Sequence, residues 1–133
     1  MSHIVQGKLN VQYTSRELLI EALAHHGNVL SNDTLFIDNG TRLVKDGKTY
    51  DIVLASDTNS MHRIGYKESA GMFKQYQENY GEIGRWTSKV SQSIQDLYVA
   101  LEYRNNLQNE GYEVSVAPIT SGGFEIVAQE ESY

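Results

Sequence analysis

The dipeptide Asn39-Gly40 is the feature of this sequence that most restricts its fold. It lies between two stretches rich in apolar residues, 34–38 and 41–44. Both residues of the pair tolerate the positive φ that a type I′ turn requires, so the pattern predicts a β-hairpin. Asp46-Gly47 follows a few residues later and leads into the apolar stretch 49–55. Together the two turns predict three successive strands that form an antiparallel meander.

Two other segments carry apolar residues at helical spacing. The first follows Thr14 and Glu17, which together match a capping box, and we expect a helix from about Ser15 to His26. The second predicts a long amphipathic helix from about Thr87 to Glu110. A glycine follows each segment directly and is well placed to end the helix.

Strands are expected at both ends of the chain. Apolar and polar residues alternate from Val5 to Tyr13, which predicts a first strand with one buried face. Near the other end, alternation over 112–117 and again over 124–129 predicts a hairpin, with Pro118 at a strand end or on an edge. The turn of this hairpin is Ser121-Gly122-Gly123, and residues 130–133 are expected to be frayed.

The pattern is weaker between residues 56 and 86. We expect a loop over 57–60 and a short strand over 62–66. Large apolar and aromatic residues then recur at helical spacing from Met72 to Tyr80, which predicts one short helix. The fold that follows is α+β, with an antiparallel sheet of about six strands and two main helices packed on one face.

Composition limits the class of protein. A chain of 133 residues fits a single domain, here taken as 1–133. The absence of cysteine excludes a disulfide scaffold, a thiolate zinc site and a cysteine nucleophile. With 17 acidic against 11 basic residues the net charge is -6, which disfavours nucleic acid as a partner. The sequence has no secretory signal and no window apolar enough to span a membrane, so we expect a cytoplasmic protein, or a stromal one if a plastid encodes it.

Histidine and carboxylate residues are the first candidates for catalysis. His25 and His26 are neighbours on a predicted helix and point about 100° apart, so they do not share a metal ion easily. Asp57 and His62 are close enough in sequence to form an acid–base pair, which leaves open a ligand pocket or an enzyme. No other motif assembles a catalytic, metal or cofactor site, so we expect none of the three, and an enzyme is the less favoured class.

Aromatic residues concentrate in the middle of the chain. They either close the core over the sheet or form a recognition surface for a protein partner. Basic residues lie among them, and a mixed aromatic and basic surface is also typical of single-stranded nucleic-acid binding, which we keep as a lesser alternative. The partner-binding candidates are Tyr66, Phe73, Tyr76, Tyr80 and Trp86, and the nucleic-acid candidates are Lys74, Arg85 and Lys89. The favoured function is therefore a small, non-catalytic interaction or adaptor protein, whose oligomeric state the sequence leaves open.

Several short strings point to a known family. They are Met1-Ser2-His3, Leu18-Leu19 with Ala22-Leu23, Tyr50-Asp51-Ile52, Gln95-Asp96-Leu97-Tyr98 and Gly111-Tyr112-Glu113-Val114. With the predicted order of helices and strands, the chain resembles the family of hypothetical chloroplast reading frames, a domain of unknown function found in plastids, cyanobacteria and some phages. The resemblance implies no catalytic residues for this chain.

Overall fold

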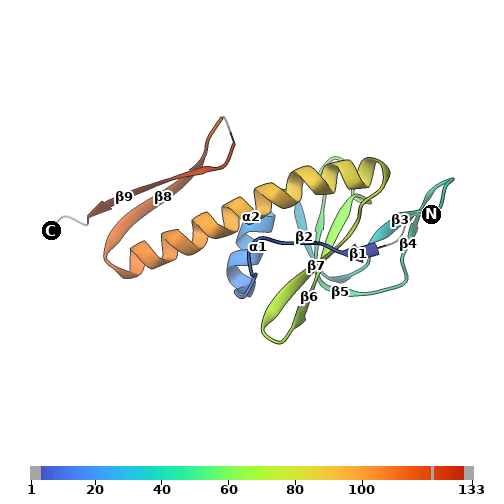
Figure 1. Cartoon of the computed structure of the whole chain (residues 1–133), viewed down its shortest axis with the longest axis horizontal. Helices are drawn as coiled ribbons and strands as arrows, with labels where there is room; N and C mark the ends of the chain where they lie inside the picture. Colours follow the sequence, from blue (N-terminus) through green and yellow to red (C-terminus); the bar gives the residue numbers. More distant parts are fainter. Residues whose placement is uncertain (1–3, 121, 131–133) are drawn as a thin grey trace.

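The computed structural model describes residues 4–120 and 122–130. Figure 1 shows a sheet at one end of the molecule, a long helix that crosses it, and a hairpin beside the far half of that helix. The elements in chain order are β1 (Ile4–Gln6), α1 (Arg16–Ala24), β2 (Asn28–Asp33), β3 (Phe36–Asp38), β4 (Leu43–Lys45), β5 (Tyr50–Ala55), β6 (Arg63–Ser69), β7 (Met72–Glu78), α2 (Gly81–Asn109), β8 (Tyr112–Pro118) and β9 (Phe124–Glu130).

The central sheet has five antiparallel strands in the order β1-β7-β6-β5-β2. Two further pairs, β3-β4 and β8-β9, form separate two-stranded sheets. The expected α+β class is therefore confirmed, with one strand fewer in the main sheet. Both helices contribute to one core cluster with the central strands, and its buried members include Leu19, Leu23, Ile52, Leu54, Ile64, Tyr66, Phe73, Ile94, Leu97 and Tyr98.

A smaller cluster lies on the other face of the sheet. It consists of Leu35, Tyr50 and Val53, and alternation along β5 places Val53 opposite to Leu54. The absence of a side chain at Gly65 leaves space for the Tyr50 ring of this cluster, since a Cβ there would lie 2.7 Å from that ring.

The hairpin at Asn39-Gly40 is confirmed, but its turn and its surroundings differ from the prediction. β3 and β4 pair with Asp38 opposite Leu43, which leaves a four-residue loop, and of the pair only Gly40 has a positive φ, of 98°. The expected three-stranded meander is wrong, since β5 pairs with β2 and β6 rather than with β4. The β3-β4 hairpin thus folds out of the main sheet.

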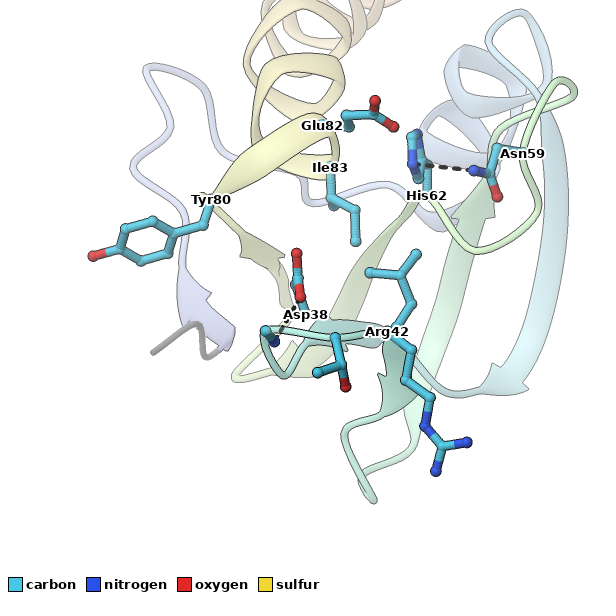
Figure 2. A pocket seen from close by; sticks show the side chains of 10 residues that line it. Asp38, Arg42, Asn59, His62, Tyr80, Glu82 and Ile83 are labelled. Atoms are coloured by element: carbon cyan, nitrogen blue, oxygen red, sulfur yellow. Dashed lines mark hydrogen bonds between the residues drawn. The ribbon is translucent and has the colours of Figure 1, made fainter.

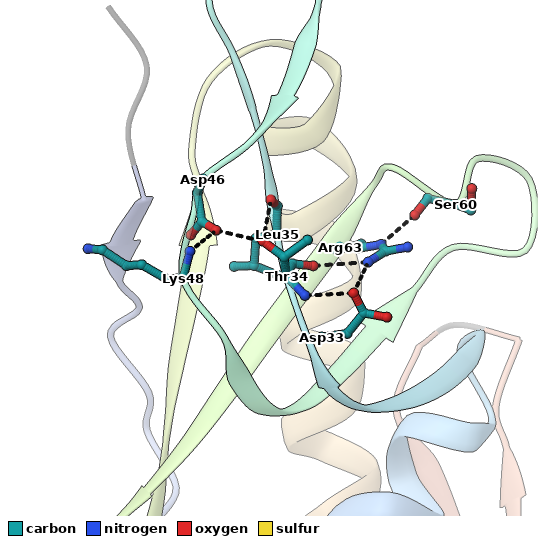
Figure 3. A network of polar contacts seen from close by, with 7 residues as sticks. All are labelled: Asp33, Thr34, Leu35, Asp46, Lys48, Ser60 and Arg63. Carbon is teal, nitrogen blue, oxygen red and sulfur yellow. Dashed lines mark hydrogen bonds and ion pairs between the residues drawn. The ribbon is translucent and has the colours of Figure 1, made fainter.

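A polar network holds this hairpin at its base (Figure 3). The Arg63 guanidinium donates to Asp33 Oδ1 and to the Thr34 carbonyl, both at 3.0 Å. The Thr34 hydroxyl donates to Asp46 Oδ1 at 2.8 Å, on the far side of the hairpin. The backbone N–H of Thr34, the main cause, and Arg63 lower the pKa of the Asp33 carboxyl. The hairpin is therefore attached to the main sheet by these hydrogen bonds and not by pairing between β4 and β5.

The short helix predicted over Met72 to Tyr80 is wrong, because these residues form strand β7. It pairs with β6 through a two-residue turn, Ala70-Gly71, whose φ angles are 54° and 78°. Phe73 and Gln75 both point into the core. The alternation was hidden because the second inward position is polar, and Gln75 is satisfied there by Tyr66 and by helix α2.

The boundaries of the predicted helices shift by a few residues. Ser15, not Thr14, is the N-cap of α1, since its hydroxyl accepts from the Leu18 N–H at 3.2 Å. Helix α2 begins six residues earlier than expected and includes Gly84. Gly84 is required there because a Cβ would lie 2.1 Å from the Asn79 carbonyl oxygen.

The strands near the two ends of the chain agree only in part with the prediction. The predicted first strand is wrong in extent, since β1 covers only Ile4–Gln6 and Tyr13 forms an isolated bridge with Phe73. Strand β2, which is rich in polar residues, was not predicted. The terminal hairpin is confirmed, and the predicted frayed tail contains Glu130, which is the last residue of β9. Ser121 and residues 131–133 lie outside the described part of the chain.

Candidate functional site

The aromatic candidates do not form one surface. Tyr66 is fully buried and Phe73 is 4% exposed, so both belong to the core and neither is accessible to a partner in this conformation. Tyr76 and Trp86 are half-buried. Tyr80 is 58% exposed at the N-cap of α2. Tyr66 and Phe73 are therefore core residues, and of the five aromatic candidates only Tyr80 exposes most of its side chain to solvent.

The basic candidates lie on two sides of the molecule. Lys74 is between the inward-pointing Phe73 and Gln75, so it points to the sheet face opposite the helices. Arg85 and Lys89 are exposed and one turn apart on α2. The three cations therefore do not line a single path for a nucleic-acid strand.

His62 lines a small pocket between the β3-β4 hairpin and the start of α2 (Figure 2). The pocket has a volume of about 260 Å³ and includes Asp38, Arg42, Tyr80 and Glu82. Asp57 is exposed and is not among its lining residues. The pair that the sequence suggested for acid–base chemistry does not meet in this pocket.

One ring nitrogen of His62 accepts a hydrogen bond from within the chain. The Asn59 side-chain oxygen accepts from the Met61 N–H at 3.1 Å, which orients the amide nitrogen toward His62. That nitrogen lies 3.2 Å from His62 Nε2 and can only donate, so Nε2 accepts. The lone pair that a general base would use is therefore engaged within the chain.

A larger cavity lies between α1, α2 and β8. It has a volume of about 530 Å³, within the range of pockets that hold small molecules or the side chains of a partner. Its floor is α2, with α1 on one side and the terminal hairpin on the other. We call it the α1–β8 groove; it is lined by Glu21, His25, His26, Ser93, Leu97, Leu101, Arg104, Gln108, Val114, Val116, Pro118 and Phe124.

An ion pair spans the rim of the groove. Arg104 holds Glu21 through two hydrogen bonds, of 2.5 and 3.0 Å, and donates also to the Asn105 side chain. The hydrogen bond from Arg104 lowers the pKa of the Glu21 carboxyl, and the same contact raises the pKa of Arg104. Each charge is thus neutralised by the other.

His26 is also satisfied within the chain. Its Nδ1 lies 2.8 Å from the Ala22 carbonyl, which can only accept, so Nδ1 donates. Its Nε2 lies 2.8 Å from the Ser93 hydroxyl. The imidazole therefore forms part of the wall, and it positions α1 against α2.

The chemistry of the groove follows from these contacts. The Glu21–Arg104 pair, His26 and Ser93 are engaged in bonds within the chain, while Leu97, Leu101, Val114 and Val116 supply apolar surface. The exposed His25 and Gln108 also line the groove. Such a site favours an uncharged, apolar occupant. Sequence reasoning missed it because the lining comes from α1, α2 and β8; the one local signal was a terminal hairpin with an apolar face.

The described residues contain no cluster of three or more histidine or acidic side chains that could hold a metal ion. Among the same residues, no helix has the length and apolar character to cross a membrane. Comparison of the chain with protein-family models, curated proteins and solved structures finds no match. The resemblance to the chloroplast reading-frame family therefore stays a prediction.

Proposed function

We propose that this protein is a non-catalytic binding module whose recognition surface is the α1–β8 groove. The observation that carries the proposal is the combination of an apolar floor with rim charges that already neutralise each other. The ion pair, His26 and Ser93 are already bonded within the chain, which favours recognition through apolar area and shape over catalysis. We further propose that the occupant is another protein and that both proteins are located in the cytoplasm, or in the stroma if a plastid encodes this chain.

The groove replaces the central aromatic segment as the favoured surface. Of the five aromatic candidates, two are in the core and two are half-buried. The groove by contrast places apolar side chains from three elements around one cavity. A partner that inserts apolar side chains there would remove both surfaces from water, which supplies binding free energy.

Blocking the mouth of the groove tests this proposal. Gln108 is exposed and lines the groove, so Gln108→Trp places a bulky ring at its mouth. Asn106 is exposed and lies about 200° around the helix, so Asn106→Trp is a matched control on the other side. The immobilised proteins are incubated with an extract of the native host, and the bound polypeptides are quantified.

We expect a partner that the wild type and Asn106→Trp retain equally and that Gln108→Trp loses by about ten-fold or more. Equal retention by both variants would place the contact elsewhere. Failure of the wild type to retain any polypeptide above a bead control would contradict the proposed function. Circular dichroism spectra confirm that the variants are folded.

A further inference from the structure

The strand that forms one wall of the groove has an open backbone edge. Strands β8 and β9 pair only with each other, and among the described residues no strand pairs with the outer edge of β8. The groove is lined by Val114, Val116 and Pro118 of β8, but by only Phe124 of β9. The open edge of β8 therefore borders the groove.

The hydrogen-bond register shows which residues present this edge. The Ile119 N–H donates to the Gly123 carbonyl at 3.0 Å, so this pair is hydrogen-bonded. Pairs alternate along an antiparallel ladder, and the register is continuous from Pro118 opposite Phe124 to Tyr112 opposite Glu130. Glu113, Ser115 and Ala117 therefore bond to β9, while the N–H and C=O groups of Tyr112, Val114 and Val116 point outward.

Pro118 agrees with this register, because it occupies an outward position and has no N–H to lose. The other outward positions of the edge, Tyr112, Val114 and Val116, carry neither a charge nor a proline. Natural sheets commonly place lysine, proline or a bulge on an exposed edge strand, and neither β8 nor β9 contains a lysine or arginine. The half-buried side chains of Val114 and Val116 line the groove, and their free backbone groups lie in the sheet plane at right angles to them. A strand added beside β8 would therefore present alternate side chains on the groove side.

We propose that the α1–β8 groove binds an extended segment of a partner protein, which adds as a third strand to the edge of β8. Backbone hydrogen bonds to Val114 and Val116 would supply affinity, and alternate side chains of the segment would enter the groove. We expect these side chains to be uncharged and apolar, since Glu21 and Arg104 already pair with each other. The exposed Glu113 and Glu125 of the hairpin disfavour acidic residues beside them.

This inference rests on the proposed function and predicts a specific pattern in the free protein. In amide hydrogen exchange, Ser115 and Ala117 should be protected by β9, whereas Val114 and Val116 should exchange at least about ten-fold faster. Protection of all four in the monomer would show that the edge is already covered and would overturn the inference. Concentration-dependent protection would assign the edge to a second copy of the chain, which also contradicts it.

Proline substitution tests strand addition in the complex. Val114→Pro removes an outward N–H without breaking the ladder to β9, and Ala128→Pro does the same on the outer edge of β9, directly opposite. Both are compared with the wild type for capture of the partner from the host extract. We expect Val114→Pro to retain at least about ten-fold less partner and Ala128→Pro to retain the wild-type amount.

The outcomes separate the two proposals. If Gln108→Trp loses the partner while Val114→Pro retains it, the groove is the recognition surface and strand addition is wrong. If neither loses it, both proposals are wrong. Equal loss in Val114→Pro and Ala128→Pro also contradicts addition at β8. Circular dichroism and the exchange rates of Ser115 and Ala117 check that each variant keeps its hairpin.

Discussion

Gly65 shows how a single residue sets the packing of the sheet. Strand β6 passes beneath the Tyr50 ring, and a Cβ at Gly65 would meet that ring at 2.7 Å. The Tyr50 hydroxyl is held by Asp46 at 2.6 Å, so the ring is fixed from its other end. Burial and this hydrogen bond both raise the pKa of Tyr50. The ring therefore has little freedom to move away from a side chain at position 65.

Gly65→Ala should consequently destabilise the protein by about 1–3 kcal/mol, the usual range for an overpacked core. Urea denaturation measures the free energy of unfolding. The matched test is the same substitution in a Tyr50→Ala background, where the penalty should shrink because the clashing ring is gone. An unchanged penalty in that background would show that the ring is not the cause.

The Glu21–Arg104 pair gives a prediction on pH. The folded-state pKa of Glu21 lies below its ordinary value of 4.5, so its stabilisation is present above that value and is lost as the pH falls through the lowered pKa. Because its side chain is 39% exposed, the contribution at neutral pH is modest, about 1 kcal/mol or less.

Glu21→Gln should therefore be less stable than the wild type at pH 7, and the difference should shrink as the pH falls below 4.5 through the lowered pKa, when measured by urea denaturation. Glu125→Gln, at an exposed position on β9, is the control and should show no such change. A Glu21→Gln deficit that persists undiminished in acid would mean that the carboxylate charge is not what stabilises this contact.

At the scale of elements, local pattern predicted helices better than strands. Both helices were found because their apolar seams repeat over many turns, and the terminal hairpin because its alternation is regular. Strand β7 was missed because residues such as Met72 and Gln75 are good helix formers, and tertiary pairing with β6 overrides that preference. The turn before it uses Ala70 at positive φ, a conformation that alanine rarely adopts.

The junction of β7 and α2 can be tested through Gly84. In the interior of a helix, glycine to alanine ordinarily stabilises by about 1 kcal/mol. Here the Cβ would lie 2.1 Å from the Asn79 carbonyl, so Gly84→Ala should instead destabilise by about 1–3 kcal/mol. Ser88→Ala, at an exposed position one turn later, is the control and should be neutral or slightly stabilising in thermal denaturation. A stabilised Gly84→Ala variant would contradict this tight junction.

At the scale of the whole molecule, the candidate site depends on contacts that no local pattern contains. Glu21 and Arg104 are 83 residues apart, and His26 and Ser93 are 67 apart, yet these pairs form the rim and wall of one groove. The α+β class followed from local signals, namely periodicity, turn residues and helix caps. The terminal hairpin and α1 both pack beside the long helix α2, and the cavity lies between them. This arrangement is a tertiary contact that no local sequence pattern contains.

The central claim is that a partner protein lies in the α1–β8 groove, and site-specific photo-crosslinking tests it most directly. A benzophenone amino acid is introduced at Gln108, at the mouth of the groove, or at Asn106, on the other side of the same helix. After irradiation in the host extract, we predict a covalent adduct with one polypeptide from position 108 and none from position 106. Adducts of equal yield from both positions, or none from position 108, would contradict the claim.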